Sequence, residues 1–147
     1  MAVETTTFSN NSADTWFRDI MFDCVLCPRA CHVNRLAGQT GYCGQTAELM
    51  AARASLHYWE EPCISGTSGS GTVFFSGCNL RCVFCQNHNI ALGKAGRVIA
   101  PEHLAEIFLQ LQEQGANNIN LVTPTHFTGA GKTAGAASSH CIQYRQL

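Results

Sequence analysis

Three cysteines, Cys78, Cys82 and Cys85, fall within eight positions of the stretch SGCNLRCVFCQNHNI. Three thiols cannot all pair into disulfides, and a closed zinc site or a fully ligated iron–sulfur cluster takes four ligands. The stretch follows TVFF, a β-branched and aromatic run that predicts a short buried strand ending at Gly77. The sequence therefore predicts a thiol-rich loop at the end of a strand.

Two kinds of metal centre are compatible with this loop. Zinc bound by the three cysteines and a fourth ligand such as His88 is the structural alternative. A four-iron cluster held by three cysteines instead leaves one iron with a free position, as catalytic metal sites do. An open iron is useful where a second molecule must bind to the metal.

A second group of cysteines, Cys24, Cys27, Cys31 and Cys43, has the spacing C-x2-C-x3-C-x11-C. These four thiols can ligate a metal without help from any other residue. The surrounding loop sequence is poor in apolar residues, so a bound metal would contribute to its stability. We expect a structural metal here, and the spacing is compatible with either zinc or an iron–sulfur cluster.

The cysteine content also bears on the cellular compartment. The nine cysteines are an odd number, and residues 1–20 lack the basic and apolar regions of a secretory signal. This combination indicates metal or redox chemistry in a reducing compartment, and we expect the cytoplasm. A net charge of −1 with 13% charged residues argues against a nucleic-acid or anionic membrane partner, because both require a basic surface.

The clearest helix is predicted in the segment PEHLAEIFLQLQEQG. Its apolar residues recur at helical spacing and form one face: Leu104, Ile107, Phe108 and Leu111. Pro101 suits the first helical position and Gly115 the position after the last turn. The following NNINLVT predicts a second strand, so the order strand, helix, strand indicates a βαβ unit. The cysteine loop and TPTHF would then lie at the carboxyl ends of neighbouring parallel strands, where ligands gather.

The remaining segments are less decisive. Residues 47–60 are compatible with a helix or with strands, and His57 within them is interpreted as a surface or core residue. The predicted organisation is a weakly ordered lead-in, a cysteine-rich segment, a βαβ core and a disordered tail without periodicity, over residues 1–20, 21–66, 67–128 and 129–147.

The spacing C-x3-C-x2-C with Phe84 before the last cysteine resembles the signature of the radical SAM superfamily. Three further stretches extend the resemblance over about residues 20–128. They are CxxCPRxCxxNRxxGxxGYCG, LHYWEEPCISGTSGSGTVFF and GANNINLVTPTHF. Together they are similar to an uncharacterised branch related to the pyruvate formate-lyase activating enzyme.

The resemblance implies an α/β fold, the N-terminal part of a partial (β/α)6 TIM-like barrel preceded by the cysteine-rich segment. It implies a [4Fe-4S] cluster on Cys78, Cys82 and Cys85, with S-adenosylmethionine (SAM) on the fourth iron. Reductive cleavage of SAM would give a 5′-deoxyadenosyl radical for hydrogen abstraction. The implied partners are a reductant such as flavodoxin or ferredoxin and a possible protein substrate.

Two further SAM contacts follow from the same resemblance. Phe84 would pack near the adenine of SAM. Many relatives hold the methionine amino group with a Gly-Gly-Glu element, where this chain has Thr123-Pro124-Thr125-His126. The hydroxyls of Thr123 and Thr125 are therefore the candidate contacts at that place.

The resemblance is lost after residue 128, where similar proteins continue with further strand and helix units. We therefore expect a chain truncated after the second barrel strand. The alternative function is a non-catalytic zinc or iron–sulfur fragment or module, inactive because its barrel is incomplete.

Overall fold

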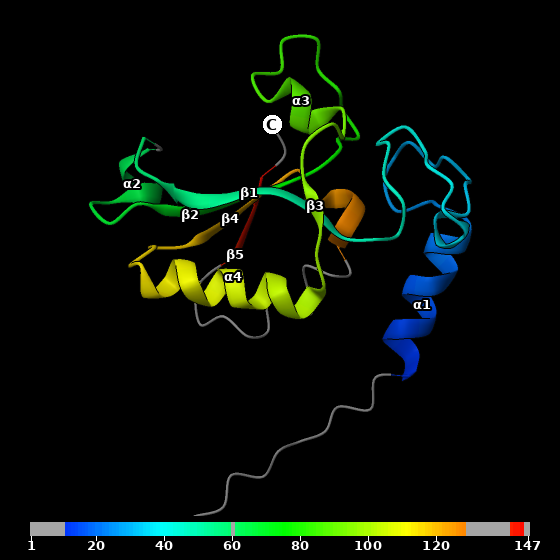
Figure 1. Ribbon diagram of the computed structural model, residues 1–147, viewed down its shortest axis with the longest axis horizontal. Coiled ribbons are helices and arrows are strands. Elements are labelled where there is room, and N and C mark those ends of the chain that lie inside the picture. The colour runs from blue at the N-terminus through cyan, green and yellow to red at the C-terminus, as the bar shows by residue number, and fades with distance from the viewer. Residues whose placement is uncertain (1–10, 60, 129–141, 146–147) are drawn as a thin grey trace, which may run out of the picture.

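The computed structural model of the protein describes residues 11–59, 61–128 and 142–145. Within them, five strands form one mixed sheet in the order β3-β1-β2-β4-β5. The strands are β1 (Met50–His57), β2 (Ser70–Phe75), β3 (Arg97–Val98), β4 (Ile119–Val122) and β5 (Ile142–Arg145). Figure 1 shows the sheet between the helix α4 (Pro101–Glu113) on one side and the loop that carries the short helix α3 (His88–Ala91) on the other.

The predicted βαβ unit is confirmed. Strand β2 pairs with β4 in parallel, and α4 connects the two strands along the chain. Pro101 occupies the first turn of α4, and Gly115 follows the helix with a φ of +89°. This left-handed conformation suits glycine, which carries no Cβ.

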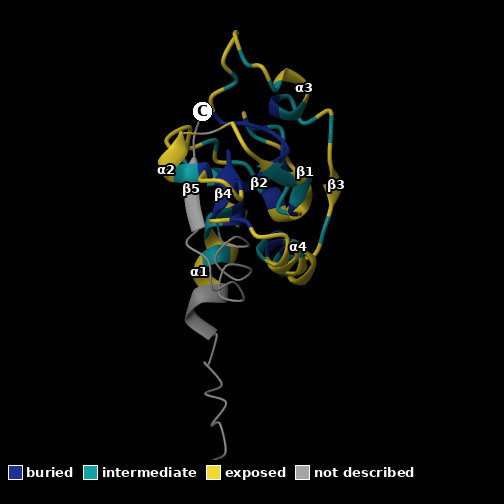
Figure 2. Cartoon of the chain, turned by 90° about the vertical axis from the view of Figure 1, so that its left-hand side faces the viewer, coloured by how far each residue is buried: buried dark blue, intermediate teal, exposed yellow. Residues whose placement is uncertain are grey.

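The hydrophobic core lies between the sheet and α4 (Figure 2). Strands β2 and β4 alternate their side chains between two faces, and the large apolar side chains point toward α4. The fully buried members of this core are Val73, Phe75, Leu104, Phe108, Ile119 and Leu121. The opposite face of the same strands carries Thr72, Phe74 and Val122, which line a cavity. The core therefore leaves one face of the sheet available for a site.

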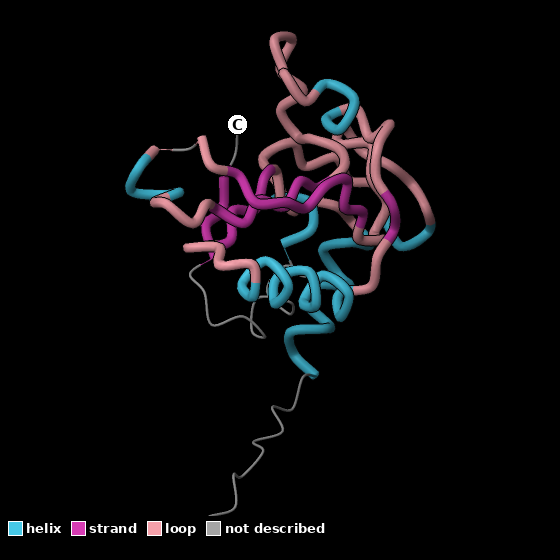
Figure 3. Tube along the Cα trace, turned by 60° about the vertical axis from the view of Figure 1, so that its left-hand side comes forward, coloured by secondary structure: helices cyan, strands magenta, loops and turns pink. Residues whose placement is uncertain are grey.

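The sequence of residues 47–60 was compatible with a helix or with strands, and the structure forms the strand β1 within this range. Strand β1 runs antiparallel to β2 and is irregular between Ala51 and Arg53. On the other side of β1, strand β3 pairs with Met50 and Ala51. Within the described residues, the pairing of β1 with β3 is limited to these two positions. Figure 3 shows β1 and its neighbours as one layer beside the helices.

Two expectations about the ends of the chain need correction. The helix α1 (Asn11–Phe22) occupies the second half of the predicted lead-in, because Phe17, Ile20 and Met21 lie at helical spacing and Met21 is buried. In the predicted disordered tail, β5 pairs in parallel with β4. The described sheet thus has three parallel strands where the sequence predicted two, and a barrel stays a prediction.

The remaining described elements are short. They are η1 (Arg35–Ala37), α2 (Pro62–Ser65) and η2 (Thr125–Phe127). Helix α1 contacts η1 within the cysteine-rich segment. Over the described ranges, no helix has the length and apolar character that crossing a bilayer requires.

Candidate metal centre

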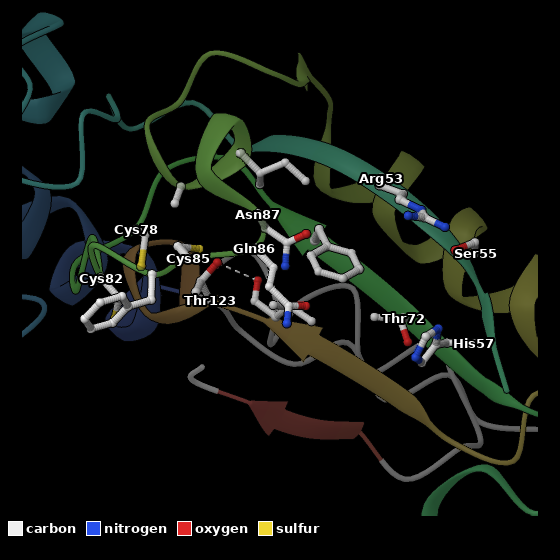
Figure 4. Close-up of a pocket in the computed structure, with 15 residues that line it drawn as sticks. Arg53, Ser55, His57, Thr72, Cys78, Cys82, Cys85, Gln86, Asn87 and Thr123 are labelled. Atoms are coloured by element: carbon white, nitrogen blue, oxygen red, sulfur yellow. Dashed lines mark hydrogen bonds between the residues drawn. The ribbon is translucent and has the colours of Figure 1, made fainter. Parts of the chain in front are cut away.

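The three clustered cysteines lie on the loop that leaves the carboxyl end of β2. Cys78 is buried, Cys85 is partly buried and Cys82 is exposed, and all three are free thiols. All three line one cavity of about 540 Å³ on the sheet face opposite α4 (Figure 4). The fold thus directs the thiols of one short loop toward a common space.

Backbone hydrogen bonds hold this loop in place. The Gly77 N–H donates to the Ile90 carbonyl at 2.8 Å, and the Leu80 N–H donates to the Cys78 Sγ at 3.4 Å. Arg81, in the middle of the loop, has a φ of +49°, a left-handed conformation that is uncommon outside glycine. Its guanidinium carbon lies 5.2 Å from the centre of the Tyr42 ring. The loop is therefore tied to α3 and to the cysteine-rich segment.

The carboxyl end of β4 reaches the same cavity. Thr123 lines the cavity and has a φ of +52°, an outlier for a β-branched residue. Its hydroxyl donates to the Val122 carbonyl at 2.8 Å (Figure 4). Backbone strain of this kind is concentrated at functional sites. Thr125, the second predicted SAM contact, lies in η2 and is not among the residues that line the cavity.

The three thiols that line the cavity are side chains of the chemical type that binds metal centres. Thiolates are the protein ligands of iron–sulfur clusters, and these thiols are unpaired and adjacent to a cavity. In the described part of the chain, no three His, Cys, Asp or Glu side chains are gathered closely enough to hold a metal ion. Thus the fold brings the three cysteines to one cavity without arranging their sulfurs as a closed ligand set.

A family comparison matches the part of the chain that carries the cysteine loop. The family model described as "Radical SAM superfamily" matches residues 72–139, from β2 through the cysteine loop and β4. Residues 72–139 belong to the radical SAM superfamily. The predicted superfamily is thereby confirmed for this part of the chain.

One curated protein is similar to this chain over a longer stretch. It is the uncharacterized protein MJ0674 of Methanocaldococcus jannaschii, 31% identical over 112 residues. The aligned region covers 71% of this chain and 31% of the relative, so the chain spans about a third of the relative's length. No solved structure matches the chain significantly.

The cysteine-rich segment packs directly against the radical SAM loop. Arg29 Nε donates to the Asn79 carbonyl at 3.0 Å, and the Arg29 guanidinium carbon lies 3.9 Å from the centre of the Tyr42 ring. Tyr42 therefore contacts Arg29 of its own segment and Arg81 of the radical SAM loop. Such cation–π contacts contribute roughly 0.5–1 kcal/mol each at exposed sites.

Within this segment Cys24 and Cys43 are buried, while Cys27 and Cys31 are partly exposed. The Tyr42 N–H donates to the Cys31 Sγ at 3.3 Å. The described residues do not arrange these four cysteines as a metal site either. The ligand set at Cys24, Cys27, Cys31 and Cys43 therefore stays a prediction.

A buried polar connection joins the segment to both strand ends. Arg35 is 1% exposed, its Nε donates to the Thr46 carbonyl at 3.1 Å and its Nη1 donates to the His126 carbonyl at 2.9 Å. The ring of His126 is buried as well, and its Nε2–H donates to the Ser76 carbonyl at 2.7 Å. Because Ser76 lies two residues before Cys78, Arg35 and His126 position the start of the radical SAM loop.

The buried ring of His126 should make the free energy of unfolding depend on pH. Burial lowers the pKa of His126 from 6.5 to about 4, with a further lowering from Arg35 and an opposing contribution from the hydrogen bond to Ser76. The unfolded chain therefore binds an extra proton between pH 6.5 and 4. Stability present above pH 6.5 should be lost as the pH falls to 4, by about 3 kcal/mol.

The check is the free energy of unfolding in urea, measured at pH 7 and at pH 4.5. The control is His126→Gln, whose amide can donate to Ser76 but does not titrate. An equal loss of stability in the wild type and in this variant would contradict the assignment to His126.

Gly77 shows how closely the two segments approach. It has a φ of +79°, and a Cβ added there would meet the Cys43 carbonyl oxygen at 2.5 Å. The variant Gly77→Ala should lower the free energy of unfolding by at least about 1 kcal/mol, the cost of a left-handed alanine, before the clash is added. Thermal unfolding checks this, with Gly115→Ala as a control because that position has a φ of +89° and open space. Equal losses in the two variants would exclude the close contact.

Several residues of the site were not predicted from the sequence. Arg53, Ser55 and His57 of β1 line the radical SAM cavity together with Gln86 and Asn87. The alternation of polar residues at 53, 55 and 57 was the signal that could have found the β1 row. Arg35 gave no such signal, because arginines are mostly exposed.

Proposed function

We propose that the chain carries the cluster-binding and SAM-binding segment of a radical SAM enzyme that abstracts hydrogen from its substrate. The observation that supports this most is the meeting of two strand ends at one cavity. The cysteines after β2 and the strained Thr123 after the parallel β4 both line it. Ligand sites of parallel sheets lie at such ends.

The residues of the chain have distinct roles in this proposal. Cys78, Cys82 and Cys85 hold a [4Fe-4S] cluster and leave one iron for SAM, and Phe84 packs near the adenine. When bound, this group supplies the electron that cleaves SAM to methionine and a 5′-deoxyadenosyl radical. In this proposal the Thr123 hydroxyl orients the amino group of SAM, and Phe74 with Val122 keeps the floor of the cavity apolar.

The finer assignment is a glycyl-radical activase similar to the pyruvate formate-lyase activating enzyme. It rests on the sequence resemblance around the three cysteines and the cysteine-rich segment. The proposal includes an external reductant of the flavodoxin or ferredoxin type and a protein as substrate. A cytoplasmic location suits it, because eight described cysteines are free thiols.

We further propose that Cys24, Cys27, Cys31 and Cys43 bind a second, structural metal, either zinc or an iron–sulfur cluster. Two observations support it: Cys24 and Cys43 are both buried, and Cys31 accepts a backbone N–H bond at its sulfur. Elemental analysis of the purified protein should find this metal and should lose it in Cys27→Ala. Unchanged metal content in that variant would exclude the site.

The competing proposal is a metal-binding fragment without catalysis. It is favoured by the exposure of Phe84 and Cys82, because radical chemistry requires a cavity closed to water. The exposed fraction of Phe84 is 91%. This reading predicts zinc in place of iron at the three cysteines.

Anaerobic reconstitution with iron and sulfide distinguishes the two proposals. The radical SAM proposal predicts a dithionite-reduced [4Fe-4S] signal in electron paramagnetic resonance whose shape changes when SAM is added. Binding of zinc alone, with no iron retained after desalting, would favour the fragment. A cluster signal whose shape does not change when SAM is added would also contradict SAM binding at an open iron.

A further inference from the structure

A row of polar side chains extends the radical SAM cavity along β1. Arg53, Ser55 and His57 are spaced by two residues, so they share one face of the strand, and all three line the cavity. Figure 4 shows them along β1, beyond Gln86 and Asn87 as seen from the cysteines. The row therefore belongs to the same cavity but lies apart from the thiols.

The positive charge of Arg53 lies at one end of this row. The lining residues of the cavity include Arg53 but no aspartate or glutamate. The Arg53 guanidinium and the Ser55 hydroxyl make no hydrogen bond or ion pair with the described residues. Arg53 is exposed, so its guanidinium faces solvent at the edge of this cavity.

The strand register gives the direction of the row. Arg53 lies opposite Phe74, four residues before Cys78, whereas His57 lies opposite Ser70 at the start of β2. Since a strand rises about 3.4 Å per residue, the row from Arg53 to His57 covers about 13 Å and leads away from the cysteines. A ligand whose polar end sits on this row can place its other end toward the thiols.

We propose that Arg53, Ser55 and His57 form a subsite for a carboxylate or phosphate group of the molecule that reacts in this cavity. A guanidinium offers parallel N–H donors that match the oxygens of either group, and a serine hydroxyl adds a third donor. The inference rests on the proposed function in one respect, the identification of the ligand as the radical substrate. The substrate class is thus a molecule, or a segment of a protein substrate, that carries a carboxylate or phosphate group.

Binding calorimetry on the full chain at low ionic strength tests the subsite, with inorganic phosphate and succinate as probes. We expect the wild type to bind at least one probe and Arg53→Gln to weaken that binding about tenfold or more. Arg53→Lys should fall between the two, because it keeps the charge and loses the planar fork. The matched control is Arg18→Gln, an exposed arginine of α1, which should leave the affinity unchanged.

Each outcome decides one point. Tighter binding of phosphate identifies a phosphate-bearing ligand, and tighter binding of succinate identifies a carboxylate. The proposal is overturned if neither probe binds the wild type, or if Arg18→Gln weakens binding as much as Arg53→Gln. It is also overturned if Arg53→Gln lowers the affinity for SAM, since Arg53 would then serve SAM itself. Iron content, measured on the same samples, reports separately on the proposed function.

Discussion

Replacing Cys82 with alanine is expected to abolish loading of the [4Fe-4S] cluster. Cys82 is one of the three thiols that line the cavity, and two remaining thiols cannot hold a cluster that normally takes at least three. After anaerobic reconstitution, the iron and sulfide retained by Cys82→Ala should fall to the level of the second cysteine group alone. The broad visible absorbance of the cluster should fall in proportion to the iron content.

The chain offers a matched control for this experiment. Cys63 is an exposed free thiol within α2, outside both cysteine groups, and Cys63→Ala should keep the iron content of the wild type. If Cys63→Ala loses as much iron as Cys82→Ala, the iron is bound unspecifically by surface thiols. If Cys82→Ala keeps its iron, the assignment of the cluster to this loop is wrong.

Replacing Arg35 with alanine should destabilise the protein by about 3 kcal/mol. The side chain is buried and donates hydrogen bonds to the carbonyls of Thr46 and His126. Its removal leaves buried acceptors without donors and opens a cavity beside the ring of Phe127, whose centre lies 5.7 Å from the guanidinium. Chemical unfolding followed by circular dichroism measures the loss.

Two variants show whether geometry or charge accounts for this effect. Arg35→Lys keeps the charge but cannot reach both carbonyls with one planar group, so it should recover only part of the stability. Arg29→Ala removes an exposed arginine of the same segment and should cost below about 1 kcal/mol. Equal losses for Arg35→Ala and Arg29→Ala would contradict the role of the buried connection.

The parts of the fold that were predicted from the sequence have strong local signals. Strand β2 follows from its β-branched and aromatic run, and α4 follows from an apolar face at helical spacing between a proline and a glycine. The position of Cys78 at a strand end follows from these two elements. Local pattern was sufficient because β2 is buried along almost its whole length and α4 buries a single face.

The parts that were missed depend on contacts distant in sequence. In β1 the alanines at positions 51, 52 and 54 fit a helix as well as a strand, and pairing with β2 decides between them. The four residues of β5 are too few to predict a strand after a segment rich in small residues. Their strand conformation depends on pairing with β4. The buried Arg35 depends on the carbonyl of His126, which is 91 positions away in the sequence. Nothing in its local sequence indicates that contact.

We propose that the loop of Cys78, Cys82 and Cys85 supports reductive cleavage of SAM. The most direct test is the amount of 5′-deoxyadenosine formed by the reconstituted chain with SAM and dithionite under anaerobic conditions. We expect 5′-deoxyadenosine in the wild type and none above background in Cys82→Ala. Absence of 5′-deoxyadenosine in a wild-type sample with full iron loading, or equal amounts in both proteins, would contradict it.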